Sequence, residues 1–466
     1  MQDLILFPLY LIAILLAAYL YRNFRYCDSQ LKKYFIPGLL VRIGGALGLG
    51  IIYLFYYHGG GDTFYYFKDS YAFNLAIQKS FSTFLQLLFL PADKITFALY
   101  DFIRLVTFFR DPSGWMADKV YGVLSVLSFH SYPVMALLMA FLSFTGTWVL
   151  FKTFASLYPP LTKQFAFAIL FVPSVFFWGS GILKDSITFG CLGWVTYSAH
   201  QIFFLRRKIL QNAIILLFMG FMALQIKAYI MLSFLPALLL WIFFTYRSRI
   251  GSQFLRVISG PSVLLISMVC GFLLINKLGN EFEEFSLTNL VSTSERFQQW
   301  HGYLAQTANA SGYSLGLIDG TWLGILSKFP AAVNVTLFRP YLWEANNPVM
   351  LMAALESIFI FGFTLYILFR NGILNTLKSV LRNPDLLFCF SFSIAFAFAV
   401  GFSSYNFGAL VRYKIPCIPF YLSGLIILNY LTLLQRRKKS EEKEWLRKRA
   451  RRSLREIYQP AMNESQ

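Results

Sequence analysis

The stretch FIPGLLVRIGGALGLGIIYLFYYHGGGDTFYYF, residues 35–67, predicts both the fold class and the position of a candidate site. Its first part is an apolar run long enough to cross a bilayer, which takes about 20 residues. Three glycines, Gly59–Gly61, follow this run and let the backbone turn sharply. Asp62 comes next, beside an aromatic cluster typical of a membrane edge. An acid at that position is costly, so it suggests a function.

Composition places the chain among polytopic membrane proteins. Of its 466 residues, 57% are hydrophobic and 14% are charged, whereas a soluble domain carries about 25% charged residues. The net charge of +19 comes from basic residues in short loops between apolar runs and in the C-terminal tail. This distribution is typical of the positive-inside rule and argues against nucleic-acid binding. The four histidines and five cysteines show neither metal-ligand spacing nor a disulfide framework.

Apolar runs predict an all-α fold of eleven transmembrane helices, which form one domain over residues 1–434 and precede a basic cytoplasmic tail, 435–466. Two further apolar stretches, 81–91 and 95–109, are too short to span. We expect them to form two interfacial helices separated by Pro91. The predicted spans lie near 3–21, 35–57, 131–151, 164–179, 186–205, 209–226, 228–246, 257–276, 349–369, 386–402 and 414–434.

The positions of Lys and Arg orient this bundle. Assigning alternate loops to opposite sides places 26 of the 41 basic residues on one face, which we therefore expect to be cytoplasmic. The N-terminus is then outside and the C-terminus inside. The outer face receives the first loop (58–130), the long loop (277–348) and each unusual polar cluster of the chain. We therefore expect a single extracytoplasmic site.

Asp62 is the candidate catalytic residue of this site. As a general base it would remove a proton from an acceptor hydroxyl that attacks an activated carbon. His58 and Tyr65 flank it and are candidates for substrate binding. The alternative is a solvated loop aspartate that follows a glycine turn.

Three further candidates lie in two later turns of the outer face. Lys184 and Asp185 follow a glycine-rich hairpin, where the lysine would contact an anionic substrate group as a point charge. The alternative is that Asp185 caps the following helix while Lys184 extends to the interface. Lys227 stands between two apolar runs and faces either a substrate phosphate or the membrane surface.

The segment 338–348 combines an arginine with flat aromatic side chains and an acid. Arg339 can hold a phosphate or carboxylate in a two-pronged fork. Tyr341 and Trp343 offer faces on which a sugar could stack, and Glu344 completes the substrate-binding candidates of this segment. The alternative is an interfacial aromatic belt with one Arg–Glu pair.

Arg412 and Lys414 are basic residues on the outer face, contrary to the overall charge trend. A negatively charged ligand would explain them, and so would long side chains that reach the interface. Together, these candidates fit a lipid-linked phosphosugar: cations hold the phosphate, aromatic rings hold the sugar and a carboxylate activates the acceptor. No DxD pair is present, so the sequence predicts no resident cofactor and leaves a divalent metal open.

These features resemble the GT-C superfamily of polytopic membrane glycosyltransferases and, more loosely, the bacterial surface-polysaccharide polymerases. The resemblance rests on the acid of GGGDTFYYF after the second helix and on the two interfacial helices expected to follow it. Basic residues near later outer helix ends, in SGILKDS, FRPYLWEANN and VRYKIP, also fit. Unlike larger members, the sequence ends shortly after its last predicted helix, so we expect no folded extracytoplasmic C-terminal domain and a protein or peptide acceptor is less favoured.

The resemblance implies sugar transfer on the outer side of a bacterial inner membrane, in cell-surface polysaccharide or glycolipid synthesis. The donor would be a polyprenyl-phosphate sugar, the acceptor a lipid-linked sugar or glycan, and Asp62 the base of an inverting reaction. One alternative is an O-antigen-type polymerase, in which Arg339 and Arg412 hold two lipid phosphates. Another is a lipid-linked oligosaccharide flippase or transporter, for which Arg42 and Glu356 would supply charges within the membrane.

Overall fold

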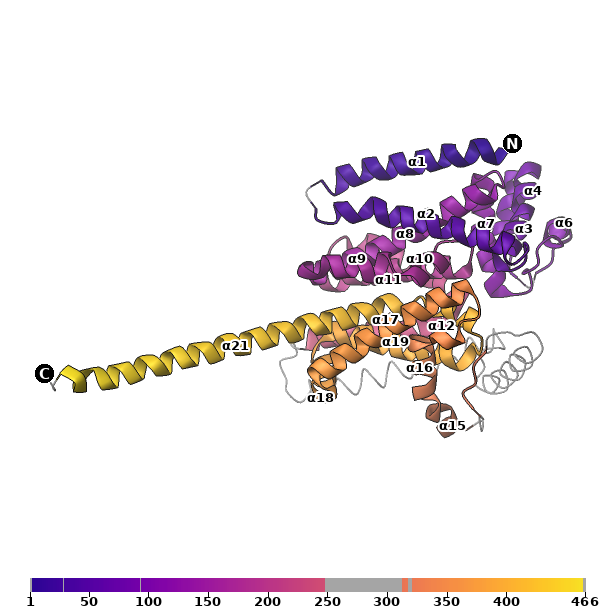
Figure 1. The fold of residues 1–466 in the computed structure, drawn as a ribbon. Coiled ribbons are helices and arrows are strands. Elements are labelled where there is room, and N and C mark those ends of the chain that lie inside the picture. The colour runs from indigo at the N-terminus through magenta and orange to yellow at the C-terminus, as the bar shows by residue number, and fades with distance from the viewer. Residues whose placement is uncertain (1, 28, 93, 248–311, 317–320, 464–466) are drawn as a thin grey trace.

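The computed structural model describes residues 2–27, 29–92, 94–247, 312–316 and 321–463. In these residues the regular structure is helical, with one isolated bridge between Gly312 and Asn406, so the predicted all-α class is confirmed. Long helices run side by side in one body, and the C-terminal part of the last helix projects from it (Figure 1).

Seven of the described helices are long and apolar enough to cross a membrane, which confirms a helical membrane protein. The predicted number of eleven spans stays a prediction, and the span expected near 257–276 lies outside the described residues. The seven are α1 (Gln2–Arg25), α2 (Lys32–Phe55), α8 (Tyr132–Leu157), α12 (Ile209–Tyr246), α17 (Pro348–Asn371), α19 (Pro384–Ser403) and the first part of α21 (Ile418–Asn463).

Two predicted spans do not form single continuous α-helices. Pro173 has no amide hydrogen to continue the preceding helix, so the stretch 164–179 forms two short helices joined at this residue. The stretch 186–205 begins earlier than expected, at Lys184, and ends in a π-helical turn. The elements are α9 (Thr162–Leu170), α10 (Pro173–Trp178), α11 (Lys184–Ala199) and η3 (His200–Leu205), with the 3₁₀ turn η2 (Pro159–Leu161) before α9.

The helix α12 folds back on itself at Lys227, where the backbone leaves the helical region (φ −145°, ψ 79°). A straight helix would hold Asn212 and Trp241 about 43 Å apart. Instead, Asn212 donates a hydrogen bond to the Arg207 carbonyl at 3.0 Å, and the rings of Trp241 and Phe204 lie 4.4 Å apart. Both arms therefore start from the same end of the bundle, and Lys227 lies at the opposite end, as predicted.

The first loop is a folded cap with its own hydrophobic core. The helix predicted for 81–91 forms over Phe81–Leu88, and the interfacial position of both predicted helices stays a prediction. The helix predicted for 95–109 is wrong beyond Ile103, because Asp69 accepts hydrogen bonds from the Thr107 amide at 2.8 Å and from the Phe108 amide at 3.3 Å. These bonds hold the segment in a non-helical turn. The cap comprises α3 (Asp62–Asp69), α4 (Tyr71–Lys79), α5 (Phe81–Leu88), η1 (Phe97–Leu99), α6 (Tyr100–Ile103) and α7 (Pro112–Leu127).

The described end of the long loop 277–348 also contains helices. Thr336 donates a hydrogen bond to the Ala397 carbonyl of α19 at 2.7 Å, and Gly401 lets the two helices approach closely. Helix α16 of this segment therefore packs against α19 within the bundle. Its elements are α15 (Trp322–Ser327), α16 (Phe329–Phe338) and η6 (Leu342–Glu344).

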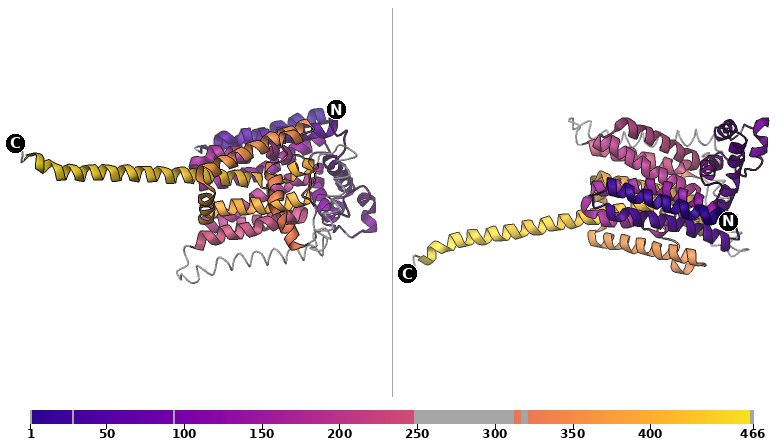
Figure 2. Two further views of the ribbon diagram at one scale, coloured as in Figure 1. Left: turned by 60° about the horizontal axis from the view of Figure 1, so that its bottom comes forward. Right: turned by 90° about the horizontal axis from the view of Figure 1, so that it is seen from above.

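Two short helices and the tail complete the fold. α18 (Ile373–Arg382) links α17 to α19, and α20 (Phe407–Tyr413) precedes α21. The predicted basic tail continues α21 as an exposed helix that leaves the body at the end opposite to α3 and α7 (Figures 1 and 2).

Candidate functional site

The backbone before Asp62 adopts conformations that favour glycine. Gly59 has a φ of 74° and Gly61 a φ of 91°, and a Cβ atom on Gly61 would lie 2.5 Å from the Tyr53 ring. This turn makes Asp62 the first residue of α3. Its carboxylate therefore lies at a helix N-terminus, where the helix dipole favours negative charge.

Asp62 belongs to a continuous chain of ion pairs. Its Oδ2 atom lies 2.7 Å from Arg412, and the same guanidinium holds Asp185 through its Nε atom at 2.7 Å. The other oxygen of Asp185 lies 2.5 Å from the Lys227 ammonium. We call these four residues the ion-pair chain. It joins α3, α20, α11 and the reversal of α12, so four distant segments meet at one point, as the sequence predicted.

Exposure divides the ion-pair chain into an open end and a buried end. The side chain of Asp62 is 40% exposed, whereas that of Asp185 is 2% exposed. Lys227 is 8% exposed, and its ammonium also lies 4.5 Å from the centre of the Tyr413 ring. Asp185 is thus a buried counter-ion between two cations, and Asp62 is the carboxylate of the chain that is open to solvent.

Lys184 lies next to this chain but has a different partner. Its ammonium is 3.0 Å from Asp111 and donates to the Ser113 hydroxyl at 2.8 Å. Ser113 in turn donates to the Ile226 carbonyl at 2.8 Å. Lys184 therefore ties the cap to the α12 reversal. Asp111 was missed in the sequence, although an aspartate before Pro112 is a typical helix cap, and its carboxylate accepts from two amides of α7.

Arg339 and Glu344 form a second charged group. Arg339 Nε donates to Glu344 at 3.0 Å, and Glu344 also accepts from the Tyr341 amide at 2.8 Å. The rings of Tyr341 and Trp343 stack at 4.9 Å, and Trp343 is 80% exposed. The Arg–Glu pair of the structural alternative is therefore present, together with an accessible aromatic face.

Lys414 is fully buried between the two groups. Its ammonium donates to the Ser357 hydroxyl at 2.9 Å and to the Arg339 carbonyl at 3.1 Å. It does not reach the interface, so the snorkelling alternative fails for this residue. α20 connects both groups, because the Phe407 ring lies 5.0 Å from the Arg339 guanidinium and Arg412 occupies the last turn of the same helix.

His58 and Tyr65 lie near Asp62 in sequence but are not part of the ion-pair chain. Both side chains are exposed, and His58 has a positive φ of 52° within the glycine turn. Tyr65 contacts the edge of the Phe108 ring, with centroids 6.2 Å apart. In the described part of the chain, no hydrogen bond or ion pair joins either side chain to the ion-pair chain.

Asp118 is a buried acid that the sequence analysis did not single out. Neither of its carboxylate oxygens has a hydrogen-bond partner among the described residues, and the side chain is fully buried in α7. Burial raises the pKa of Asp118 well above its ordinary value of 3.8, and the nearby Asp69 raises it further. The sequence around Asp118 does not indicate that this acid is buried, because the residue lies within an otherwise ordinary helix.

Two other buried charges fix the short helix α10. Glu356 accepts hydrogen bonds from the amide and the hydroxyl of Ser174 at the N-terminus of α10. Arg42 donates to the Gly179 carbonyl at its C-terminus at 2.6 Å. A carboxylate at the N-terminus and a cation at the C-terminus both complement the helix dipole. These residues thus have a structural role, which weakens the argument for a transport path.

The described residues hold no group of three or more His, Cys, Asp or Glu side chains that could bind a metal ion. No protein-family model matches the chain, and comparison with curated proteins and with solved structures finds no significant match. The site must therefore be interpreted from its own geometry.

Proposed function

We propose that the chain is a membrane glycosyltransferase that transfers a sugar from a polyprenyl-phosphate donor to a lipid-linked or glycan acceptor on the extracytoplasmic side. The observation that supports this most directly is the pairing of an accessible acid, Asp62, with a largely buried cation, Arg412, at one end of an apolar bundle. Such a site offers a base and an anion-binding group to a substrate that stays in the membrane.

Arg412 is suited to hold the donor phosphate. Its Nε atom faces the buried Asp185, and its terminal nitrogen faces the accessible Asp62. A phosphate that binds this terminal nitrogen competes with Asp62 for it. Donor binding would therefore release the Asp62 carboxylate while Asp185 keeps the guanidinium in place.

The released carboxylate can then act as the general base. Asp62 takes the proton of the acceptor hydroxyl, whose oxygen forms a bond to the anomeric carbon of the donor. The bond between that carbon and the phosphate oxygen breaks, and its electron pair leaves with the polyprenyl phosphate. Arg412 stabilises the negative charge of this leaving group. Lys227, which pairs with the other oxygen of Asp185, adds a second positive charge to the site.

A polysaccharide polymerase is the second candidate, and the Arg339 group favours it. A polymerase binds two lipid-linked chains, and α20 joins two cationic groups on the same end of the bundle. The stacked rings of Tyr341 and Trp343 beside Arg339 would hold a sugar of the second chain.

The test is an Asp62→Asn variant reconstituted in proteoliposomes with undecaprenyl-phosphate-linked hexoses as donors, with release of undecaprenyl phosphate as the readout. We expect a loss of about 10²–10⁴-fold in turnover, the usual contribution of a general base. Asp101→Asn is the matched control, because Asp101 lies in the same cap, is 80% exposed and, among the described residues, forms an ion pair with Arg104 alone. It should keep full turnover.

Full turnover in the Asp62→Asn variant would exclude Asp62 as the base. Absence of turnover by the unmodified protein with every donor would exclude this substrate class. Asp185→Asn is unsuitable for the test, because it removes the carboxylate paired with the buried Lys227 and one of the two carboxylates that hold Arg412, and breaking a buried pair costs about 3–5 kcal/mol of stability.

A further inference from the structure

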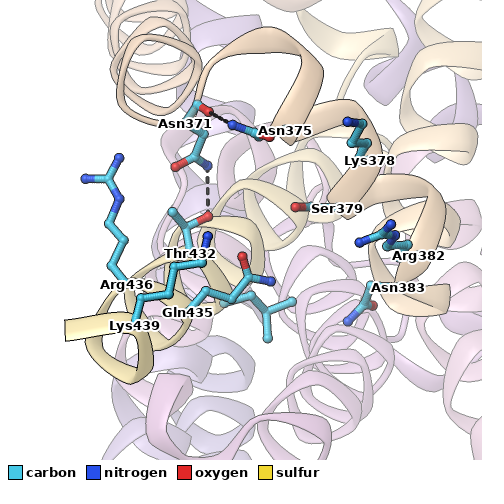
Figure 3. Close-up of a pocket in the computed structure, with 11 residues that line it drawn as sticks. Asn371, Asn375, Lys378, Ser379, Arg382, Asn383, Thr432, Gln435, Arg436 and Lys439 are labelled. Atoms are coloured by element: carbon cyan, nitrogen blue, oxygen red, sulfur yellow. Dashed lines mark hydrogen bonds between the residues drawn. The ribbon is translucent and has the colours of Figure 1, made fainter. Parts of the chain in front are cut away.

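A second polar site lies at the end of the bundle opposite to Asp62. A cavity of about 510 Å³ opens between the end of α17, α18, the start of α19 and α21. Figure 3 shows Lys378 and Arg382 on the α18 side of this cavity and Arg436 and Lys439 on the α21 side. The charge pattern of the loops predicts that this end faces the cytoplasm.

Positively charged side chains line the cavity, and none of them forms an ion pair with an acid among the described residues. The described residues that line it include four cations and no carboxylate. Among the described residues, no ion pair involves any of the four, and Arg436 instead donates a hydrogen bond to the Arg370 carbonyl. Lys378 and Arg382 are one helical turn apart, a spacing at which like charges repel. An anion bound in the cavity would reduce this repulsion and would also attract the two cations of the α21 wall.

Amide and hydroxyl groups shape the floor of the cavity. Asn371 donates to the Thr432 hydroxyl at 2.9 Å and so joins the end of α17 to α21. Asn375 donates to the Asn371 carbonyl at 3.0 Å, which ties the first turn of α18 to the same point (Figure 3). The two walls are therefore held together independently of any ligand.

The opposite face of α18 indicates where the cavity lies relative to lipid. Ile373 and Leu374 are each 72% exposed, and Leu377 and Leu381 are 54% and 58% exposed. Polar residues occupy the other face, toward the cavity. A short helix with one exposed apolar face and one basic face is typical of a helix that lies in the membrane interface. The cavity then opens at the level of the lipid headgroups.

We propose that this cavity binds the phosphate-bearing headgroup of an anionic phospholipid of the cytoplasmic leaflet. Basic pockets between transmembrane helices on the cytoplasmic side are suited to such headgroups. A soluble phosphate offers the same charge, but the exposed apolar face of α18 favours a ligand that carries acyl chains. The proposal does not depend on the glycosyltransferase assignment, since the two sites lie at opposite ends of the bundle.

The test uses the full-length protein in a neutral detergent, with thermal unfolding measured against increasing dioctanoyl phosphatidylglycerol. We expect saturable stabilisation of the unmodified protein, because a ligand that binds only the folded state raises its stability. Dioctanoyl phosphatidylcholine and inorganic phosphate form the comparison arms and should stabilise it far less. The double variant R382Q/R436Q removes one cation from each wall and should bind phosphatidylglycerol at least about tenfold more weakly.

The matched control is K443Q/R447Q, which removes two exposed cations of α21 beyond the cavity and should leave the affinity unchanged. Both variants alter exposed side chains, so neither should prevent folding. Equal affinity of R382Q/R436Q and the unmodified protein would overturn the site. Equal stabilisation by inorganic phosphate would overturn the lipid assignment, and equal stabilisation by phosphatidylcholine would overturn the requirement for net negative charge.

Discussion

Two buried acids at the Asp62 end of the bundle differ in how their negative charge is compensated. Asp185 is buried between Arg412 and Lys227, so its charge is neutralised by contact. Asp118 is equally buried, but no donor reaches it from the described residues. A buried carboxylate without a partner is stable only when it carries a proton.

Asp118 therefore makes the folding stability depend on pH. Its pKa is raised in the folded state, so the folded protein binds this proton more tightly than the unfolded chain. Stability from this group is present below the ordinary pKa and is lost as the pH rises through the folded pKa. Each unit of the shift corresponds to about 1.4 kcal/mol. Asp118→Asn mimics the protonated acid, so its unfolding temperature should exceed that of the unmodified protein at pH 8.

The difference between Asp118→Asn and the unmodified protein should shrink as the pH falls toward 5, when thermal unfolding is followed in detergent. Asp101→Asn, which changes an exposed acid of the same cap, should show no such trend. A lower unfolding temperature of Asp118→Asn at each pH would mean that the ionised carboxylate stabilises the fold.

The contact between α8 and α11 depends on glycine. A Cβ atom on Gly146 would lie 2.0 Å from the Gly190 carbonyl oxygen, and one on Gly193 would lie 2.1 Å from the Gly146 carbonyl oxygen. Small residues let helix backbones approach closely in membrane proteins. Because the obstructing atoms belong to the backbone, they cannot move aside without separating the helices.

We expect Gly146→Ala to destabilise the protein by about 1–3 kcal/mol, the usual cost of overpacking. Gly220→Ala is the matched control: this glycine lies within α12, and no atom of the described residues comes within 4 Å of its Cβ position. It should be neutral or stabilise the helix by up to about 1 kcal/mol. Thermal unfolding of both variants in detergent measures the difference, and equal stability would refute close packing of α8 against α11.

Elements whose formation depends on composition could be predicted from the sequence, and elements that depend on distant contacts could not. Long apolar runs predicted the helices, and the isolated Lys227 between two such runs marked a reversal. The turn at Thr107 could not be predicted, because the acid that holds it is Asp69, in an earlier helix. The packing of α16 against α19 had no local signal either.

The same distinction applies to the candidate site. Residue type and position in the outer loops were enough to select Asp62, Asp185, Lys227 and Arg412, which the structure joins. Sequence could not show that Lys184 pairs with Asp111, because the two are far apart in the chain. The sequence also suggested His58 as a substrate-binding residue, but it does not show which neighbours of Asp62 contact the ion-pair chain.

For the whole molecule, the charge distribution predicts which end faces the cytoplasm. Cys27 is exposed near the predicted inner end, and Phe97 is 100% exposed in the cap at the predicted outer end. A membrane-impermeant maleimide added to intact cells should therefore label a Phe97→Cys variant in a Cys27→Ser background. The native Cys27 should react only after the cells are permeabilised. The reverse labelling pattern would invert the orientation and place Asp62 in the cytoplasm.

The length of α21 has a mechanical consequence. This helix begins at Ile418, shortly after Lys414, and runs without a break to Asn463, about 69 Å along its axis. A continuous helix is stiff in the direction of its axis, so a pull on the projecting tail displaces Ile418 together with Arg436 and Lys439, which line the basic cavity. The α21 wall of the basic cavity and the residue that follows the turn at Lys414 are thus parts of one helix. An axial displacement of the tail therefore reaches the Asp62 end of the bundle along this helix and continues to Arg412 only through the turn at residues 414–417.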